Sequence, residues 1–203
     1  MLEFWLIRHG ETDWNVEHRI QGWTNIPLNT NGLHQAAVLS ESLEGIPFQA
    51  IYTSDLDRAL VTARILARRI PAPVHITDGL REQCLGEAEG LLRSVANQRF
   101  PNGAPSREPE AQMRQRLLKV IQRITTDVRQ GRVLCVSHGG LIRAWLTYLG
   151  QPAPALGNTS ITRFALGPHG WRVMCVNCQD HLPYASGRIF GDVDHPLPLR
   201  QQE

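Results

Sequence analysis

The clearest strand pattern in the sequence is Arg132-Val-Leu-Cys-Val-Ser137, which is followed directly by His138-Gly139-Gly140. The four apolar residues 133–136 at the centre of this stretch are typical of a buried strand. The two glycines allow the backbone to turn and to begin a helix that carries apolar residues at helical spacing. We therefore expect a strand, a turn and a helix, with His138 at the carboxyl end of the strand.

Strand and helix patterns alternate on either side of this unit. Short apolar runs predict further strands at residues 3–7, 50–53, 74–76, 161–166 and 171–176. Apolar residues at helical spacing predict helices at 33–43, 56–66 and 113–128. Ser54 and Asp55 are natural N-caps for the helix at 56–66. The alternation predicts an α/β fold, a three-layer sandwich with a mostly parallel central sheet and helices on both faces.

Two stretches lack this regular pattern. Residues 87–110 have weak periodicity and contain the turn-forming string Pro101-Asn-Gly-Ala-Pro-Ser106. The last residues are rich in proline and glycine. We expect a single domain over residues 1–185, a short lid at about 87–110, and an irregular tail at 186–203.

The composition excludes several classes of protein. With 42% hydrophobic and 20% charged residues, the chain is neither disordered nor fibrous. The net charge of +2 predicts no strongly electropositive face, so we expect no nucleic-acid partner. No apolar run approaches the roughly 20 residues of a membrane span, and charged residues interrupt the apolar start. We therefore expect a cytoplasmic protein that binds no membrane.

The cysteine pair Cys175 and Cys178 forms a CxxC motif near the end of the chain. Together with His181 it offers three zinc ligands, but no clear fourth ligand lies nearby. A redox pair would be expected between a strand and a helix, whereas this pair lies late in an apolar run. We interpret both as ordinary thiols.

Two histidines follow predicted strands. His9 lies in Arg8-His9-Gly10 after the first strand, and His138 follows the strand quoted above. Ligands of open α/β sheets bind beyond the carboxyl ends of the strands. Gly139 precedes a helix and lets an anion approach backbone N–H groups. One such histidine is usually structural, but two at separate strand ends predict a shared cleft.

Charged residues at other strand ends complete a chemical set. Arg8 and Arg58 supply two guanidinium groups that fit phosphate oxygens. Glu82 follows the strand at 74–76 and is a candidate proton donor. Transfer of a phosphoryl group from a monoester needs clustered positive charge, a nucleophile such as neutral imidazole, and an acid for the leaving alkoxide. The two histidines, the two arginines and Glu82 supply all of these groups.

Five segments, in this order, resemble the histidine phosphatase superfamily, which has the phosphoglycerate-mutase-like fold. They are LIRHGETDWN (6–15), QGWTNIPLNTNGLHQA (21–36), YTSDLDRALVTA (52–63), LREQCLGEAEG (80–90) and VLCVSHGGLIRA (133–144). The resemblance spans about residues 2–182 and ends in NCQDHL (177–182). The RHGE start, the SDLxRA string and the late SHGG make it specific.

The resemblance implies a role for each matching residue. His9 is the nucleophile that becomes phosphohistidine, and Glu82 protonates the leaving group and later activates water. Arg8, Arg58 and His138 form the rest of the phosphate pocket. Asn15, Gln21 and Gly22 match segments that bind substrate. The family uses no metal, and we expect no cofactor.

The resemblance leaves the substrate and the acceptor of the phosphoryl group open. The lid is shorter than in the mutase branch, which favours water as acceptor and hydrolysis of a small phosphorylated metabolite. A phosphoglycerate mutase, a phosphoprotein phosphatase and a non-catalytic anion-binding domain are the alternatives. Ala88 stands where many relatives have tryptophan, which predicts a looser loop. Relatives are often dimers, so a homodimer is possible.

Three arginines of the lid, Arg93, Arg99 and Arg107, have two interpretations. They are either solvated, or they contact a carboxylate or a second phosphate of the substrate.

Overall fold

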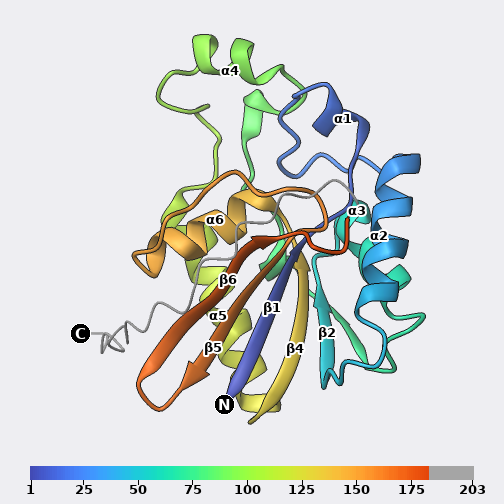
Figure 1. Ribbon diagram of the computed structural model, residues 1–203. Coiled ribbons are helices and arrows are strands. Elements are labelled where there is room, and N and C mark those ends of the chain that lie inside the picture. The colour runs from blue at the N-terminus through green and yellow to red at the C-terminus, as the bar shows by residue number, and fades with distance from the viewer. Residues whose placement is uncertain (183–203) are drawn as a thin grey trace.

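A six-stranded sheet forms the centre of the computed structural model, which describes residues 1–182 (Figure 1). The strands are β1 (Leu2–Arg8), β2 (Ala50–Thr53), β3 (Val74–Ile76), β4 (Gly131–Ser137), β5 (Ile161–Gly167) and β6 (Gly170–Cys178). Their order is β3-β2-β4-β1-β5-β6. The pairs among β1 to β4 are parallel, whereas β5 is antiparallel to both β1 and β6. The expected mostly parallel sheet is confirmed, and the expected tail at 186–203 lies outside the described residues.

Helices cover both faces of the sheet, as expected. They are α1 (Asp13–Val16), α2 (Thr30–Ser42), α3 (Asp57–Leu66), α4 (Arg93–Arg99), α5 (Glu110–Asp127) and α6 (Gly139–Tyr148), with 3₁₀ helices η1 (Asp78–Leu80) and η2 (Gly86–Ala88). Successive side chains of a strand point to opposite faces. Phe4 of β1 therefore packs with α5 and α6, and Trp5 packs with α2 and α3. Because both faces are buried, the central residues of β1 (4–7) and β4 (133–136) are apolar without interruption, which is why the sequence predicts both strands well.

The start of α3 differs from the expectation. Leu56 is the N-cap residue of this helix and makes no side-chain capping bond, so Ser54 and Asp55 are not its caps. The chain stays extended through Leu56, and the Asp55 carboxylate accepts a hydrogen bond of 2.7 Å from Arg81 Nε instead. Asp55, which the local sequence predicts to cap α3, instead forms an ion pair with Arg81, a residue distant in the sequence.

The lid at 87–110 is more ordered than expected because it contains α4. A small apolar cluster of Ile20, Ala88, Ala96 and Ala104 attaches it to the rest of the molecule. Alanine side chains bury little apolar area, so this cluster contributes less to stability than the two main cores do. In Figure 1, α4 and α1 lie beyond the edge of the sheet toward which β1 runs.

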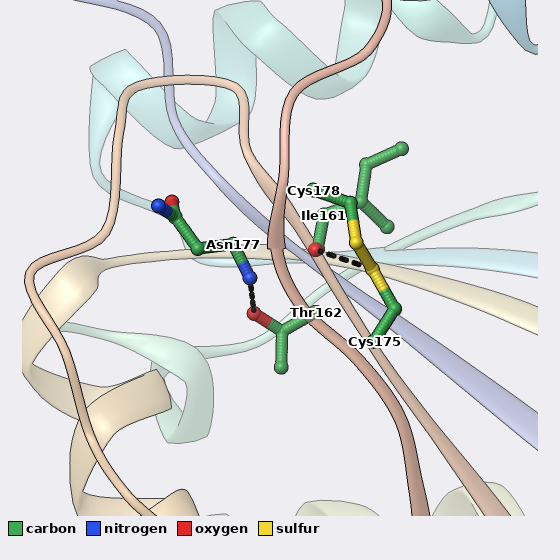
Figure 2. Close-up of a disulfide and its surroundings, with 5 residues drawn as sticks. All are labelled: Ile161, Thr162, Cys175, Asn177 and Cys178. Carbon is green, nitrogen blue, oxygen red and sulfur yellow. Dashed lines mark hydrogen bonds between the residues drawn. A yellow bond between two sulfur atoms is a disulfide. The ribbon is translucent and has the colours of Figure 1, made fainter. Parts of the chain in front are cut away.

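The CxxC motif forms a disulfide between Cys175 and Cys178 on β6 (Figure 2). The expectation of ordinary thiols is wrong for this pair, and the bonded sulfurs cannot serve as zinc thiolates. In a regular strand, residues three apart face opposite sides. Here the pairing of β5 with β6 shifts register near Arg163, and Asn177 has φ 57°. This β-bulge brings both sulfurs to one side.

Candidate active site

His9 lies directly after β1 and is buried. Its Nδ1 is 2.7 Å from the carbonyl oxygen of Gly10. Because a carbonyl oxygen only accepts hydrogen bonds, Nδ1 carries the proton and Nε2 keeps its lone pair. Burial, and then the charges of Arg58 and Arg8, hold the pKa of His9 well below its usual range. The ring is therefore neutral at neutral pH, the state that a nucleophile requires.

His138 lies between β4 and α6, with its ring centroid 5.2 Å from that of His9. Its side chain is fully buried, and neither ring nitrogen has a hydrogen-bond partner among the described residues. Burial and the nearby positive charge of Arg58 lower its pKa well below the usual range. A buried polar atom without a partner costs about 1–3 kcal/mol, so two on one ring point to a ligand-binding role.

Two arginines lie beside these histidines. Arg58 is 1% exposed, and its Nη1 and Nη2 donate to the carbonyls of Thr24 (2.9 Å) and Gly22 (2.7 Å). Its Nε is buried without a partner in the described part of the chain. Arg8 Nη1 donates to the carbonyl of Leu156. Burial lowers the pKa of Arg8 and brings the pKa of Arg58 to about 10, so both stay charged at neutral pH.

Glu82 reaches the same site from the segment after η1. Its Oε2 accepts a hydrogen bond from Gly140 N (2.8 Å), and its Oε1 accepts one from Gln83 N (2.9 Å). Its negative charge raises the pKa of both Arg8 and Arg58, against the larger lowering by burial, because it lies near both. The structure thus brings the two histidines, the two arginines and the carboxylate to one edge of the sheet.

Two glycines at the start of α6 permit this close arrangement. A Cβ added at Gly140 would lie 2.3 Å from Glu82 Oε1, so any larger residue would displace the carboxylate. A Cβ at Gly139 would lie 3.4 Å from Arg8 Nε, which places the backbone of Gly139 against the guanidinium.

The other expected binding residues lie in the loops around this cluster. Asn15 closes a capping box with Thr12, and its Oδ1 also accepts from Asn158 Nδ2 at 3.2 Å. Gly22 has φ 52° and offers its carbonyl to Arg58. Gln21 is buried, and its Oε1 has no partner within the described residues.

Arg116 of α5 organises the segment that carries Glu82, a role that our sequence analysis missed. Its guanidinium donates to the carbonyls of Arg81 and Glu82 (both 2.7 Å) and pairs with Glu108 at 2.8 Å. The available signal is its position beside Leu117, on the buried face of α5. An arginine on an apolar stripe needs a polar partner.

Two more residues hold the loops behind the site and also went unassigned. Glu89 accepts hydrogen bonds from Trp23 N (3.0 Å) and from Thr24 N (2.9 Å) and Oγ1 (2.7 Å), so it fixes the loop whose carbonyls hold Arg58. These bonds lower the pKa of Glu89 although its partial burial opposes them. Asn158 donates from Nδ2 to the carbonyl of His9 at 3.0 Å. Both contacts join segments far apart in sequence, so local patterns carry no signal for them.

A match to a family model identifies the class of protein. Residues 4–179 match the model of the histidine phosphatase superfamily (branch 1), and the chain belongs to this family. The chain is 33% identical over 183 residues to the uncharacterized phosphatase PhoE of Bacillus subtilis, with 87% of this chain and 95% of that protein covered. It is 32% identical over 216 residues to the probable phosphoglycerate mutase GpmB of Salmonella arizonae, with 96% and 95% covered.

Its fold is also similar to that of a solved structure with a named activity. The structure of a mycobacterial glucosyl-3-phosphoglycerate phosphatase with VO3 superimposes with a TM-score of 0.80 at 26% identity, covering 87% of this chain and 99% of that one. Phosphatases and phosphoglycerate-mutase-like proteins are therefore the relatives of this chain, and a phosphatase or phosphoryl-transfer enzyme is the class that they define.

Residues 1–182 offer no candidate for a membrane span or for a clustered metal site. No helix in this part of the chain is long and apolar enough to cross a membrane. Nor do three or more His, Cys, Asp or Glu side chains gather there in a way that would hold a metal ion.

Proposed function

We propose that this protein hydrolyses a phosphomonoester of a small metabolite through a phosphohistidine on His9. One observation carries the proposal. A neutral, buried His9 lies beside the buried Arg58, the partly buried Arg8 and His138. Neither His9 Nε2 nor the ring nitrogens of His138 have a partner among the described residues. A neutral nucleophile surrounded by positive charge and free hydrogen-bonding groups suits a phosphate dianion.

The first step transfers the phosphoryl group to the enzyme. His9 Nε2 attacks phosphorus as the bond to the ester oxygen breaks, and Glu82, entering as the carboxylic acid, gives its proton to the departing alkoxide. The products are an alcohol and phosphohistidine. Arg8, Arg58 and His138 hold the non-bridging oxygens, with Gly139, Asn15, Gln21 and Gly22 as further binding residues.

The second step releases phosphate and restores the enzyme. The Glu82 carboxylate takes a proton from water as the water oxygen attacks phosphorus. The P–N bond breaks, its electron pair returns to His9 Nε2, and inorganic phosphate leaves. Hydrolysis rather than transfer to an alcohol requires that water reach the phosphohistidine, and the shortness of the lid favours this.

The test measures phosphate release and the phosphohistidine together. Wild type and His9→Ala are incubated in EDTA with a panel of phosphorylated metabolites, and quenched samples are examined for an acid-labile, alkali-stable phosphoprotein. We expect release and labelling by wild type and neither by His9→Ala. His75→Ala, which changes a histidine stacked on Tyr52 outside the site, is the matched control.

Other results would contradict the proposal in separate ways. Release by His9→Ala at the wild-type rate would exclude the covalent route. Labelling of wild type without phosphate release, with return of the phosphoryl group to phosphoglycerate, would favour a mutase. No release and no labelling with any panel member would overturn hydrolysis of small metabolites.

A further inference from the structure

A cleft of about 480 Å³ opens beside Glu82 and Gly140, between the lid and α6. Arginines line it from both sides: Arg93 and Arg107 from the lid and Arg143 from α6. The carboxylates on its wall are Glu82, which belongs to the site above, and Glu110. The part of the cleft beyond Glu82 is therefore positively charged, and Arg99, the third lid arginine of the sequence analysis, is not among its lining residues.

Arg107 is held next to the proposed proton donor. Its Nη2 donates to Gln83 Oε1 at 3.2 Å, and Gln83 directly follows Glu82. Gln83 is itself buried and fixed, because its Nε2 donates to the carbonyl of Glu108 at 2.7 Å. The Arg107 guanidinium therefore has a defined position on the leaving-group side of Glu82.

The other two arginines extend the positive charge along the cleft. The charge of Arg93 contributes to the lowered pKa of Arg8, so Arg93 lies near the phosphate end. Its guanidinium has no hydrogen bond or ion pair within residues 1–182. Arg143 Nε donates to the carbonyl of Ala153 at 3.3 Å, which leaves its two terminal nitrogens without partners in the same range. All three guanidinium groups keep donors for a ligand.

We propose that Arg93, Arg107 and Arg143 bind a second anionic group of the substrate, a carboxylate or a second phosphate. This inference rests on the proposed function, because the first phosphate occupies the site formed by Arg8, Arg58 and the two histidines. Three like charges around one cleft repel one another, and an anion among them relieves that repulsion. Guanidinium groups also match both anions through paired hydrogen bonds.

The rest of the cleft wall limits what joins the two anions. The cleft wall has apolar surface from Leu85, Phe100 and Met113. It has polar groups from Asn97 and Thr147. A short carbon chain or a single sugar ring fits a cleft of this volume, about 480 Å³. The substrate class is therefore a small phosphomonoester with a second negative charge beyond the ester oxygen.

The test compares esters that differ in the second anion. One arm uses 3-phosphoglycerate and glycerol 3-phosphate, and the other uses fructose 1,6-bisphosphate and fructose 6-phosphate. In at least one arm, we expect wild type to prefer the ester with two anions. Arg107→Gln and Arg93→Gln should lower kcat/KM for that ester about tenfold, mainly through KM, because each loses a charged hydrogen bond. The arm that responds identifies the anion as carboxylate or phosphate.

Arg99→Gln provides the control, since it removes the same charge from α4, the helix that carries Arg93, at a position outside the cleft lining. We expect this variant to change kcat/KM by no more than about twofold for either ester of an arm. If Arg107→Gln lowered kcat/KM equally for both esters of each arm, or if wild type showed no preference, the second-anion site would be disproved while the proposed hydrolysis stood.

If no ester is hydrolysed, a binding experiment tests the second-anion site separately from the proposed hydrolysis. Calorimetry with 3-phosphoglycerate and fructose 1,6-bisphosphate, each against its single-anion counterpart, applies the same comparison to wild type, Arg107→Gln and Arg99→Gln. Tighter binding of a two-anion ester that Arg107→Gln alone removes would support the site without hydrolysis. Equal binding of all esters would disprove it.

Discussion

Two histidines lie side by side in this site, and their hydrogen bonds differ in a way that suits the different roles we propose for them. His9 has its Nδ1 bonded to Gly10 and so presents Nε2 as a base or nucleophile. His138 has no partner at either nitrogen among residues 1–182, and a neutral imidazole still carries one N–H that donates to a phosphate oxygen. A backbone carbonyl thus distinguishes the proposed nucleophile from the proposed donor, although burial and the charges of Arg58 and Arg8 lower the pKa of both rings.

Because burial and two arginines lower the pKa of His9, its ring should remain neutral below the usual histidine pKa of about 6.5. We expect its imidazole NMR signals, assigned by loss in His9→Gln, to stay those of a neutral ring as pH falls through about 6.5. Arg58→Gln removes one positive charge and should raise this pKa. Protonation of wild-type His9 at or above that pH would contradict the electrostatic argument.

The residues to which we assign direct roles in the proposed chemistry stand out in the sequence, whereas the residues that position them do not. His9, Arg58 and His138 follow strand ends, where the architecture itself indicates a site. Asn158 and Glu89 act through contacts with distant loops, and such contacts depend on the completed fold. A histidine or arginine at a strand end indicates a functional site by its chemistry and position, whereas an asparagine in a loop does not.

Helix α5 contributes a positioning residue to the site although it lies in the covering layer. Arg116 holds the carbonyls of Arg81 and Glu82, and Trp23 Nε1 donates to the same Glu82 carbonyl at 2.7 Å. The backbone of the proposed acid is therefore fixed from two elements. Displacement of that backbone should impair proton transfer more than phosphate binding.

We expect Arg116→Gln to lower kcat about tenfold or more for alkyl phosphates, whose leaving groups need a proton. For 4-nitrophenyl phosphate, whose leaving group departs as an anion, the loss should be much smaller. Steady-state rates with both substrates measure the difference, with Glu82→Gln as the reference. Arg123→Gln, on the same helix but exposed at 68%, should leave both rates unchanged. Equal losses for the two leaving groups would show that Arg116 has a general structural role.

Strand β6 carries the disulfide, and its effect on stability should be modest. The bond closes a loop of two intervening residues, since Cys175 and Cys178 are 3 apart. A loop this short restricts the unfolded chain little, so we expect reduction to lower the free energy of unfolding by at most about 2 kcal/mol. Urea unfolding with and without reductant measures this, and a Cys175→Ser/Cys178→Ser variant should not respond to reductant. An identical response of wild type and variant would contradict the disulfide.

The whole molecule consists of a sheet with a large apolar core on each face and a lid with a small apolar cluster of its own. Residues of β1 and β4 pack into large apolar clusters on both faces, and their continuous apolar runs made them predictable. The buried core of the lid cluster is Ile20 and three alanines, with Leu85, Leu91 and Phe100 partly buried against it, and hydrogen bonds such as that of Arg107 to Gln83 add to the attachment. These few apolar positions leave no clear periodicity in the sequence. Helix α4 was therefore missed because Ala96 is its one buried residue, and a single alanine makes no apolar stripe in the sequence.

Burial of His9 and His138 should make the stability of the whole protein depend on pH in a defined window. Folding lowers the pKa of both rings, so between the unfolded value of about 6.5 and the lower folded values the unfolded chain binds more protons. Stability is therefore complete above about 6.5 and is lost as pH falls through this window, by up to about 1.4 kcal/mol per pH unit for each ring. His181, whose pKa burial also lowers, adds a contribution of the same sign.

Urea unfolding between pH 7.5 and 5 measures how the free energy of unfolding changes with pH, in a range where the carboxylates contribute little to that change. Asp55 and Glu89 have lowered pKa values, so their contributions are lost only at lower pH, below about 4. A His9→Gln/His138→Gln variant removes both buried imidazoles and should flatten the dependence to the part that His181 retains. If the variant kept the wild-type slope, the protons taken up on unfolding would come from other groups. The two rings could then not be the buried neutral pair on which the proposed chemistry depends.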